Sequence, residues 1–528
     1  MIATFSSHFF FATFSAILLG LSLAAPRAHA QDAASFYVRE YRVQGAKQLS
    51  RLEVETAVYP FLGPGRTVED IEQARTALEK AYKDKGYQTV GIDVPQQDGT
   101  QGIIILQAIE APVGRLRVTG SRFYDIERIK RKAPSIAPGK VPNFNEVTKD
   151  IIALNKLADR KITPELKTGV EPNTVDIDLK VEDKLPLHGT LELNNRYSPD
   201  TTEYRLNGSL SYGNLWQLGH TLGVNFQIAP ERLDDAKVFS AYYLAPLNEE
   251  WSLMLQGTKQ DSNVSTLGGA AVAGRGEIYG LRFLRSLPTR DKFYQSLSFG
   301  FDYKHFDEDV IVGDQTLITP ITYWPLTLSY AASWAGEKSD TDLNIAINMH
   351  ARGMGSDIYE FDNKRYNATG SYLYVRSDLT HTHILPGDFE VMARIQGQMS
   401  STPLINSEQF AGGGLSTVRG YLESTALGDY GVFATLELRS PSLLKSTDED
   451  KEDRNWQLYG FIDGGKLAIL DPLPEQQTYS DMVSFGIGSS IKLFGHLNGS
   501  IDVGFPLVNQ GVISAGDALM TFRLWADF

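Results

Sequence analysis

The sequence predicts two small α+β repeats followed by an all-β domain, a transmembrane β-barrel of about sixteen antiparallel strands. Two observations lead to this prediction. An order of strand, helix, helix, strand, strand occurs twice before Pro186, and beyond that residue apolar and polar side chains alternate. The polar positions of these later segments hold Asn, Ser, Thr, Gln and Gly rather than the Lys and Glu of a soluble surface. Such residues are typical of the water-filled lumen of a membrane barrel.

The composition excludes several classes of protein. The 528 residues include no cysteine and carry a formal net charge of −14. A chain without cysteine has no disulfide scaffold, no thiol nucleophile and no cysteine-bound zinc. The acidic balance argues against a nucleic-acid-binding protein, which needs a basic surface.

Residues 1–30 are predicted to be a cleaved secretory signal. An apolar stretch runs from Phe9 to Ala25, and the small-x-small motif Ala-His-Ala follows at 28–30. This pattern is typical of a signal-peptidase site, so we expect the mature chain to begin near Gln31 and to be exported from the cytoplasm.

Residues 31–111 are predicted to form the first repeat. In its second helix Ile71, Ala74, Leu78 and Tyr82 are spaced three or four residues apart, so one helical face is buried. Gly86 supplies the C-terminal stop of that helix. The expected elements are a strand at 36–43, helices at 50–59 and 68–85, and strands at 88–94 and 102–110.

Residues 112–184 are predicted to form the second repeat, with the same order of elements. Both copies carry the motif R-V-x-G after the first strand, at 42–45 and at 117–120. A three-stranded sheet of this kind leaves edge backbone groups unpaired, and such an edge accepts an extended peptide as an added strand. The alternative interpretation is a pair of inert spacers. The expected elements are a strand at 113–118, helices at 126–133 and 144–158, and strands at 162–168 and 174–181.

Residues 185–528 are predicted to form the barrel. In 221–228, for example, Leu222, Val224 and Phe226 alternate with polar residues and glycine. Lipid offers no partner for an unpaired backbone group, so a membrane sheet has to close on itself. The final segment carries Phe522 and Phe528 on its apolar face, as expected for a closing strand.

A glycine-rich connection at about 401–427, between the eleventh and twelfth strands, is predicted to fold into the lumen. It carries the motif Val418, Arg419, Gly420, Tyr421. A guanidinium in a partly dehydrated lumen needs carboxylate partners, and its planar fork can take two.

Two carboxylates are predicted to hold this arginine. Alternation places Phe461 and Asp463 of the thirteenth strand inward, with Gly465 two residues further on, and it places Glu437 of the twelfth strand inward as well. We expect Arg419 to pair with Asp463 and Glu437 and so to tether the loop to the wall. The alternative is an exposed loop charge beside an aspartate that merely faces the lumen.

The two repeats resemble polypeptide-transport-associated (POTRA) domains. The mature chain as a whole resembles the two-partner secretion transporters, which are haemolysin and filamentous-adhesin secretion/activation proteins of the outer-membrane insertase superfamily. The resemblance depends on the repeats together with V-R-G-Y at 418–421, F-x-D-x-G at 461–465 and G-N-L-W-Q-L-G-H at 213–220. It implies that Arg419 is the conserved-loop arginine of the family and Asp463 its partner on the strand.

The resemblance also implies a location and partners. It implies an outer-membrane protein of a Gram-negative bacterium with POTRA domains in the periplasm. These domains would bind an unfolded partner polypeptide, and the barrel would export it. Outer-membrane lipid, the barrel-assembly machinery and periplasmic chaperones are the other expected partners of a monomer, and no nucleic acid is expected.

Two other functions stay open at this point. One is an insertase that assembles other outer-membrane barrels by opening the seam between its first and last strands. The other is a passive diffusion porin with periplasmic appendages. Insertases of the superfamily usually carry three or more POTRA domains, so two repeats favour secretion.

No enzymatic activity, cofactor or metal site is expected. The segment 460–466 fits a phosphate-binding loop pattern, but Leu467 stands where Ser or Thr is required and the segment is a predicted strand. We interpret His381 and His383 as solvated residues of a polar turn, and the acidic run 448–453 as a solvated periplasmic turn.

Overall fold

The computed structural model describes residues 35–528 except 266–271, 291, 313–314 and 445–453. The predicted signal segment and the acidic run 448–453 therefore lie outside the described residues. The described chain forms two compact units. One comprises residues up to Arg117 with Ala133–Asp150 and Pro164–Asp178, and the other comprises Val118–Lys132, Ile151–Thr163 and Leu179–Phe528.

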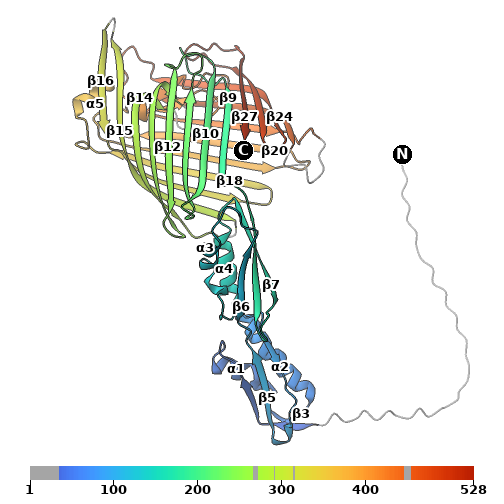
Figure 1. Ribbon diagram of the computed structural model, residues 1–528. Helices are drawn as coiled ribbons and strands as arrows, with labels where there is room; N and C mark the ends of the chain where they lie inside the picture. Colours follow the sequence, from blue (N-terminus) through green and yellow to red (C-terminus); the bar gives the residue numbers. More distant parts are fainter. Residues whose placement is uncertain (1–34, 266–271, 291, 313–314, 445–453) are drawn as a thin grey trace, which may run out of the picture. The chain divides into compact units, whose positions relative to one another are not determined.

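The first repeat is a three-stranded sheet with two helices (blue in Figure 1). The strand order is β2-β5-β4, with β2 parallel and β4 antiparallel to β5. The predicted strand 36–43 is divided into two, because β1 pairs not with this sheet but with β3, which the sequence did not indicate. The elements are β1 (Phe36–Val38), β2 (Glu40–Gln44), α1 (Arg51–Val58), β3 (Gly63–Arg66), α2 (Val68–Asp84), β4 (Gly91–Asp93) and β5 (Ile103–Ile109).

Local sequence explains where these helices begin. Ser50 and Glu53 form a reciprocal capping box at the start of α1, and Thr67 and Asp70 do the same for α2. Each box satisfies backbone N–H groups that have no partner inside the helix. The four apolar residues predicted on one face of α2 are all buried, and they pack in the core of the repeat.

The second repeat has the sheet order β6-β8-β7, and its R-V-x-G glycine has the same role as that of the first. The φ angle is 81° at Gly45 and 87° at Gly120. A β-carbon at Gly45 would lie 2.4 Å from the carbonyl oxygen of Ala108, and one at Gly120 would lie 2.3 Å from that of Val181. Both positions therefore require glycine, since the backbone passes this close to the central strand. The elements are β6 (Val113–Thr119), α3 (Ile126–Arg131), α4 (Phe144–Leu154), β7 (Arg160–Thr168) and β8 (Val175–Asp183).

The barrel is a closed sheet of sixteen strands within the described part of the chain (green to red in Figure 1). The long strand β15 pairs with both β16 and β17, which are two halves of one strand interrupted at Pro325. Proline cannot donate to the strand ladder, which explains a break there. The strands are β9 (Leu187–Asn194), β10 (Arg205–Leu215), β11 (His220–Ile228), β12 (Ala236–Pro246), β13 (Trp251–Ser265), β14 (Val272–Ser286), β15 (Phe293–Val312), β16 (Gln315–Tyr323), β17 (Leu326–Ala335), β18 (Ser339–His350), β19 (Tyr372–Ile384), β20 (Glu390–Ser400), β23 (Tyr430–Arg439), β24 (Asn455–Ala468), β25 (Tyr479–Leu493), β26 (Leu497–Pro506) and β27 (Leu519–Asp527).

The predicted alternation is confirmed on β24. Leu458 and Ile462 are 47% and 60% exposed on the outer face, whereas Phe461 and Asp463 are 3% and 1% exposed. The barrel therefore presents apolar side chains outward and keeps carboxylates inside, the arrangement that a lipid environment requires.

The seam between the first and last strands is short. β27 and β9 share five paired positions, whereas β9 with β10 and β26 with β27 share eight each. An ion pair between Arg523 and Glu192, 2.8 Å long, crosses the seam.

No helix in the described ranges is long and apolar enough to cross a membrane. The prediction of a polar turn at His381 and His383 is wrong, because β19 continues to Ile384 and both residues lie near its end. The ring of His381 forms a hydrogen bond with the hydroxyl of Thr341 on the neighbouring strand.

Candidate functional site: a loop tethered inside the barrel

The connection between β20 and β23 folds against inward-facing residues of the barrel wall. These strands are the eleventh and twelfth of the barrel, as predicted. The connection contains a short 3-10 helix, Asn406–Glu408, and a small hairpin of β21 (Phe410–Gly412) and β22 (Ala426–Gly428). Its motif residues Val418, Arg419, Gly420 and Tyr421 are all buried.

The side chain of Arg419 reaches two carboxylates on neighbouring strands. Its Nε lies 2.7 Å from Oδ2 of Asp463 and its Nη2 lies 2.9 Å from Oδ1, so the aspartate takes the guanidinium in bidentate fashion. The backbone N–H of Arg419 donates to the same carboxylate at 3.0 Å. Nη1 lies 2.5 Å from Oε2 of Glu437. The structure thus brings together the three residues that the sequence pairs.

Two contacts of Arg419 were missed by the sequence analysis. Oδ1 of Asp502 on β26 lies 3.5 Å from Nη1, and the guanidinium carbon lies 3.5 Å from the centre of the Phe461 ring. Alternation along β26, where Ile501 is exposed and Asp502 buried, is the signal from which Asp502 could have been found. The aromatic face adds a cation–π contact in a site that is largely removed from water.

The charges around Arg419 form a connected network. Nε of Arg439 lies 2.6 Å from Oε1 of Glu437, and the hydroxyl of Tyr459 donates to Asp502 at 2.9 Å. The three carboxylates are each at most 7% exposed at their side chains, so every one of them needs such a partner.

The other residues of the V-R-G-Y motif have distinct roles. Val418 and Tyr421 belong to an apolar cluster with Phe433 of the wall. The hydroxyl of Tyr421 donates to the carbonyl of Val508 at 2.7 Å. Gly420 has a φ of 88° and lies against the backbone of Gly504, where a β-carbon would come within 2.6 Å of the Gly420 nitrogen. Glycine in both places lets the loop backbone touch the wall.

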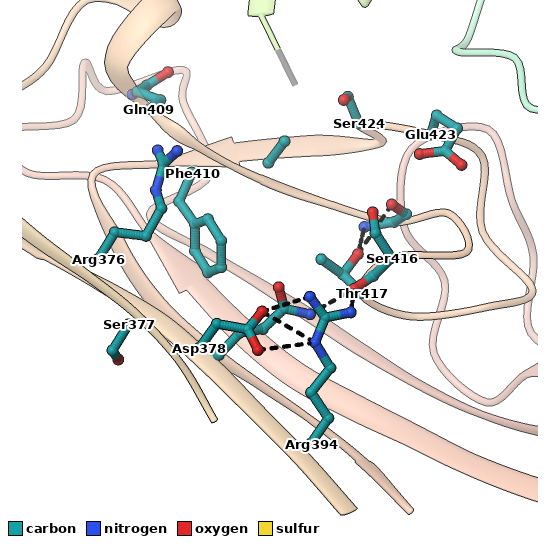
Figure 2. A pocket seen from close by; sticks show the side chains of 13 residues that line it. Arg376, Ser377, Asp378, Arg394, Gln409, Phe410, Ser416, Thr417, Glu423 and Ser424 are labelled. Carbon is teal, nitrogen blue, oxygen red and sulfur yellow. Dashed lines mark hydrogen bonds and ion pairs between the residues drawn. The ribbon is translucent and has the colours of Figure 1, made fainter. Parts of the chain in front are cut away.

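The loop is also held on its other side. Figure 2 shows Arg394 of β20 paired with Asp378 of β19, beside the loop residues Ser416 and Thr417. Nη1 of Arg394 and Nε2 of Gln396 both donate to the carbonyl of Ser416, at 3.2 and 2.5 Å. A small cavity of about 130 Å³ remains between these groups and the hairpin. Further along, Oε1 of Glu423 lies 2.7 Å from Nε of Arg196, which follows β9.

Comparison with known proteins supplies a family. The model of the haemolysin secretion/activation protein family ShlB/FhaC/HecB matches residues 173–491, more than half of the chain. The model of the ShlB-type POTRA domain matches residues 36–111.

Individual relatives and solved structures are similar to the chain at low sequence identity. The chain is 22% identical to the outer membrane transporter CdiB of Dickeya dadantii strain 3937, over 93% of this chain and 87% of that protein. It is 20% identical to the heme/hemopexin transporter protein HuxB of Haemophilus influenzae strain 86-028NP, over 72% of this chain and 67% of that protein. Among solved structures, CdiB from Escherichia coli superposes with a TM-score of 0.62 at 19% identity, covering 96% of this chain and 93% of that one.

Breaking the Arg419–Asp463 pair is expected to loosen the hairpin 410–428. Removing one member of a buried ion pair costs about 3–5 kcal/mol, because the other charge stays buried without its partner. We expect Asp463→Ala to increase backbone hydrogen exchange throughout the hairpin 410–428, measured by mass spectrometry on the purified protein.

Asp481→Ala is the matched control. Asp481 forms an ion pair with Lys466, and both side chains are about half exposed. An exposed pair contributes about 0–1 kcal/mol, so this variant should exchange like the unaltered protein. Unchanged exchange in the hairpin of Asp463→Ala would contradict the tether.

Gly465 of the strand motif is expected to tolerate no side chain, unlike the glycine beside it. A β-carbon at Gly465 would lie 2.2 Å from the ring of Phe433 and 2.3 Å from the carbonyl oxygen of Val432, whereas one at Gly464 meets nothing closer than 3.6 Å. Gly465→Ala should destabilise the barrel by about 1–3 kcal/mol through overpacking. Gly464→Ala should be neutral. The stability of each variant is measured as the temperature at which the barrel loses its folded mobility in SDS gels. Equal temperatures for the two variants would contradict the prediction that Gly465 alone excludes a side chain.

Proposed function

The chain belongs to the haemolysin secretion/activation protein family ShlB/FhaC/HecB and is an outer-membrane transporter of the two-partner secretion type. From this premise we propose that its POTRA domains bind an unfolded partner polypeptide in the periplasm and that its barrel exports this polypeptide. The observation that carries the proposal is the combination of a lumen loop tethered by Arg419 with a first repeat whose sheet edge is open.

The open edge is strand β2 of the first repeat. β2 pairs with β5 on one side only, and a groove of about 620 Å³ runs between β2 and α1. Tyr41 lies at the buried side of this groove, and Tyr59 is 74% exposed at its rim. Burial raises the pKa of Tyr41 to about 12, so its hydroxyl stays neutral at physiological pH.

The groove suits an extended and amphipathic segment. Its apolar lining includes Val43, Leu49 and Val54, and its rim carries Arg42 and Glu55. An added strand gains main-chain hydrogen bonds from the edge and places alternate side chains on the apolar lining. A disordered client can meet these requirements without a fixed sequence.

The tethered loop supports a regulated path rather than an open pore. Its hairpin is packed against β23, β24 and β26 through Arg419 and its carboxylates. We propose that the hairpin moves aside when a client enters.

We also propose the predicted domain boundaries: a signal at 1–30, POTRA domains at 31–111 and 112–184, and the barrel from 185 with its lumen loop. A closed barrel formed by one chain supports a monomer as the working form. We expect the barrel-assembly machinery and periplasmic chaperones to help its insertion into the membrane.

An insertase is the second candidate function. The short seam between β27 and β9 supports it, because this ladder has five paired positions and each neighbouring ladder has eight. A diffusion porin has less support, since the tethered hairpin lies in the path of solutes.

Deleting the gene in its native host is expected to remove one secreted polypeptide from the culture medium and cell surface. Quantitative mass spectrometry of both fractions measures this loss. Expression of the unaltered chain should restore the polypeptide. Tyr59→Ser should restore it several-fold less well, because the variant removes the exposed aromatic rim of the client groove.

Val68→Ser is the control for the groove variant. Val68 is 68% exposed in the same repeat but does not line the groove, so its variant should restore export fully. If deletion instead lowers the amounts of many outer-membrane barrels, the protein is an insertase. If it changes only the uptake of small solutes, the protein is a porin.

A further inference from the structure

We propose that Glu408 is a second positioning residue of the lumen loop, which holds the base of the loop on a different part of the wall from Arg419. Glu408 ends the short 3-10 helix that precedes the hairpin, and it is 2% exposed. A carboxylate removed from water in this way has to be paired and hydrogen-bonded.

Three side chains of the barrel wall satisfy it. Nζ of Lys304 on β15 lies 2.5 Å from Oε1 of Glu408, and the hydroxyl of Tyr323 on β16 donates to the same oxygen at 2.6 Å. The hydroxyl of Tyr374 on β19 donates to Oε2 at 2.7 Å. These are the seventh, eighth and tenth strands of the barrel, whereas the partners of Arg419 lie on the twelfth, thirteenth and fifteenth.

An apolar shell closes around this carboxylate. Tyr323 and Tyr374 belong to a buried cluster that also contains Leu404 and Ile405 of the loop base. Phe361 of α5 (Ile358–Lys364), between β18 and β19, joins the same cluster. The low polarity of these surroundings strengthens the ion pair with Lys304 and makes it costly to leave either partner alone.

The far end of the loop is fastened to the same base. Asp429, which is 0% exposed, accepts hydrogen bonds from the backbone N–H of Leu404 at 2.9 Å and from Nε2 of Gln409 at 3.1 Å. Its other oxygen accepts from the N–H of Leu470, which follows β24, at 2.7 Å. Residues 404–409 and 429 therefore form one fixed base that does not involve Arg419.

This arrangement divides the loop into two parts with separate fastenings. Release of Arg419 loosens the hairpin 410–428, which keeps its contacts through Ser416 and Glu423, while the base formed by Glu408 and Asp429 stays in place. The inference rests on the proposed function only for its purpose, since the geometry involves no client.

Spin-label distances test the division directly, because the chain contains no cysteine and each introduced pair is unique. Pro320 on β16 is an exposed reference position, Asn406 reports the base, and Ser416 reports the hairpin. Double electron–electron resonance is recorded on the full chain in detergent for the pairs P320C/N406C and P320C/S416C.

Arg419→Ala is expected to broaden and shift the 320–416 distance distribution and to leave the 320–406 distribution unchanged. Glu408→Gln is expected to broaden the 320–406 distribution, since it leaves the ammonium of Lys304 buried without a counter-charge. The double variant E408Q/K304M removes that charge, and it should restore the 320–406 distribution at least in part. A merely space-filling role for Glu408 would not produce this rescue.

Two outcomes would overturn the proposal. One is a 320–406 distribution that moves with Arg419→Ala as much as the 320–416 distribution does. The other is a 320–406 distribution that Glu408→Gln leaves unchanged. If Glu408→Gln fails to fold, Tyr374→Phe removes one hydroxyl from the same carboxylate and should give a smaller broadening of the same distribution. The distance measurement needs no client, so a result that contradicts the role of Glu408 does not affect the export proposal. In the same way, loss of export in a variant would not by itself contradict the role of Glu408.

Discussion

A positive charge held away from water is the constraint on which the interior of this barrel depends. Arg419 is 8% exposed, and its guanidinium has to find compensating charge inside the lumen. Asp463, Glu437 and Asp502 supply it from three strands, and the ring of Phe461 covers one face. On either side of it in the chain, Val418 is buried in an apolar cluster and Gly420 lies against the backbone of Gly504.

The two halves of the protein treat unpaired backbone groups in opposite ways. The barrel closes, because lipid offers no hydrogen bonds to an exposed strand edge. The first repeat stays open at β2, where water satisfies the backbone groups of the edge. The same chemistry therefore gives a closed wall in one part of the molecule and, in another, an edge to which a further strand can be added.

Much of this architecture is predictable from the sequence, and the failures have physical reasons. Alternation identifies the sixteen strands, the buried face of α2 and the inward position of Asp463, because periods of two and of 3.6 residues report directly on burial. The contacts of the site with more distant strands are harder to predict. Alternation along β26 predicts that Asp502 faces inward, but nothing in the local sequence predicts that β26 contacts the loop.

Glu408 and the strand β3 illustrate the limit more clearly. The partners of Glu408 come from strands far apart in the chain, so only the closed barrel brings them together. The strand β3 begins in a Gly-Pro-Gly stretch, Gly63–Gly65, which is typical of a turn, and it forms because β1 supplies a partner. Tertiary pairing here overrides local preference.

A loop that is fastened to strands on both sides of a cylinder also ties those strands to one another. Lys304, Tyr323 and Tyr374 hold the base of the loop, and the carboxylates around Arg419 hold its hairpin, so the loop connects strands from different parts of the barrel wall. Opening the contacts of Arg419 would remove one of these connections and leave the one at the base. The wall also depends on the seam between β27 and β9, which has five paired positions and is crossed by the ion pair of Arg523 with Glu192.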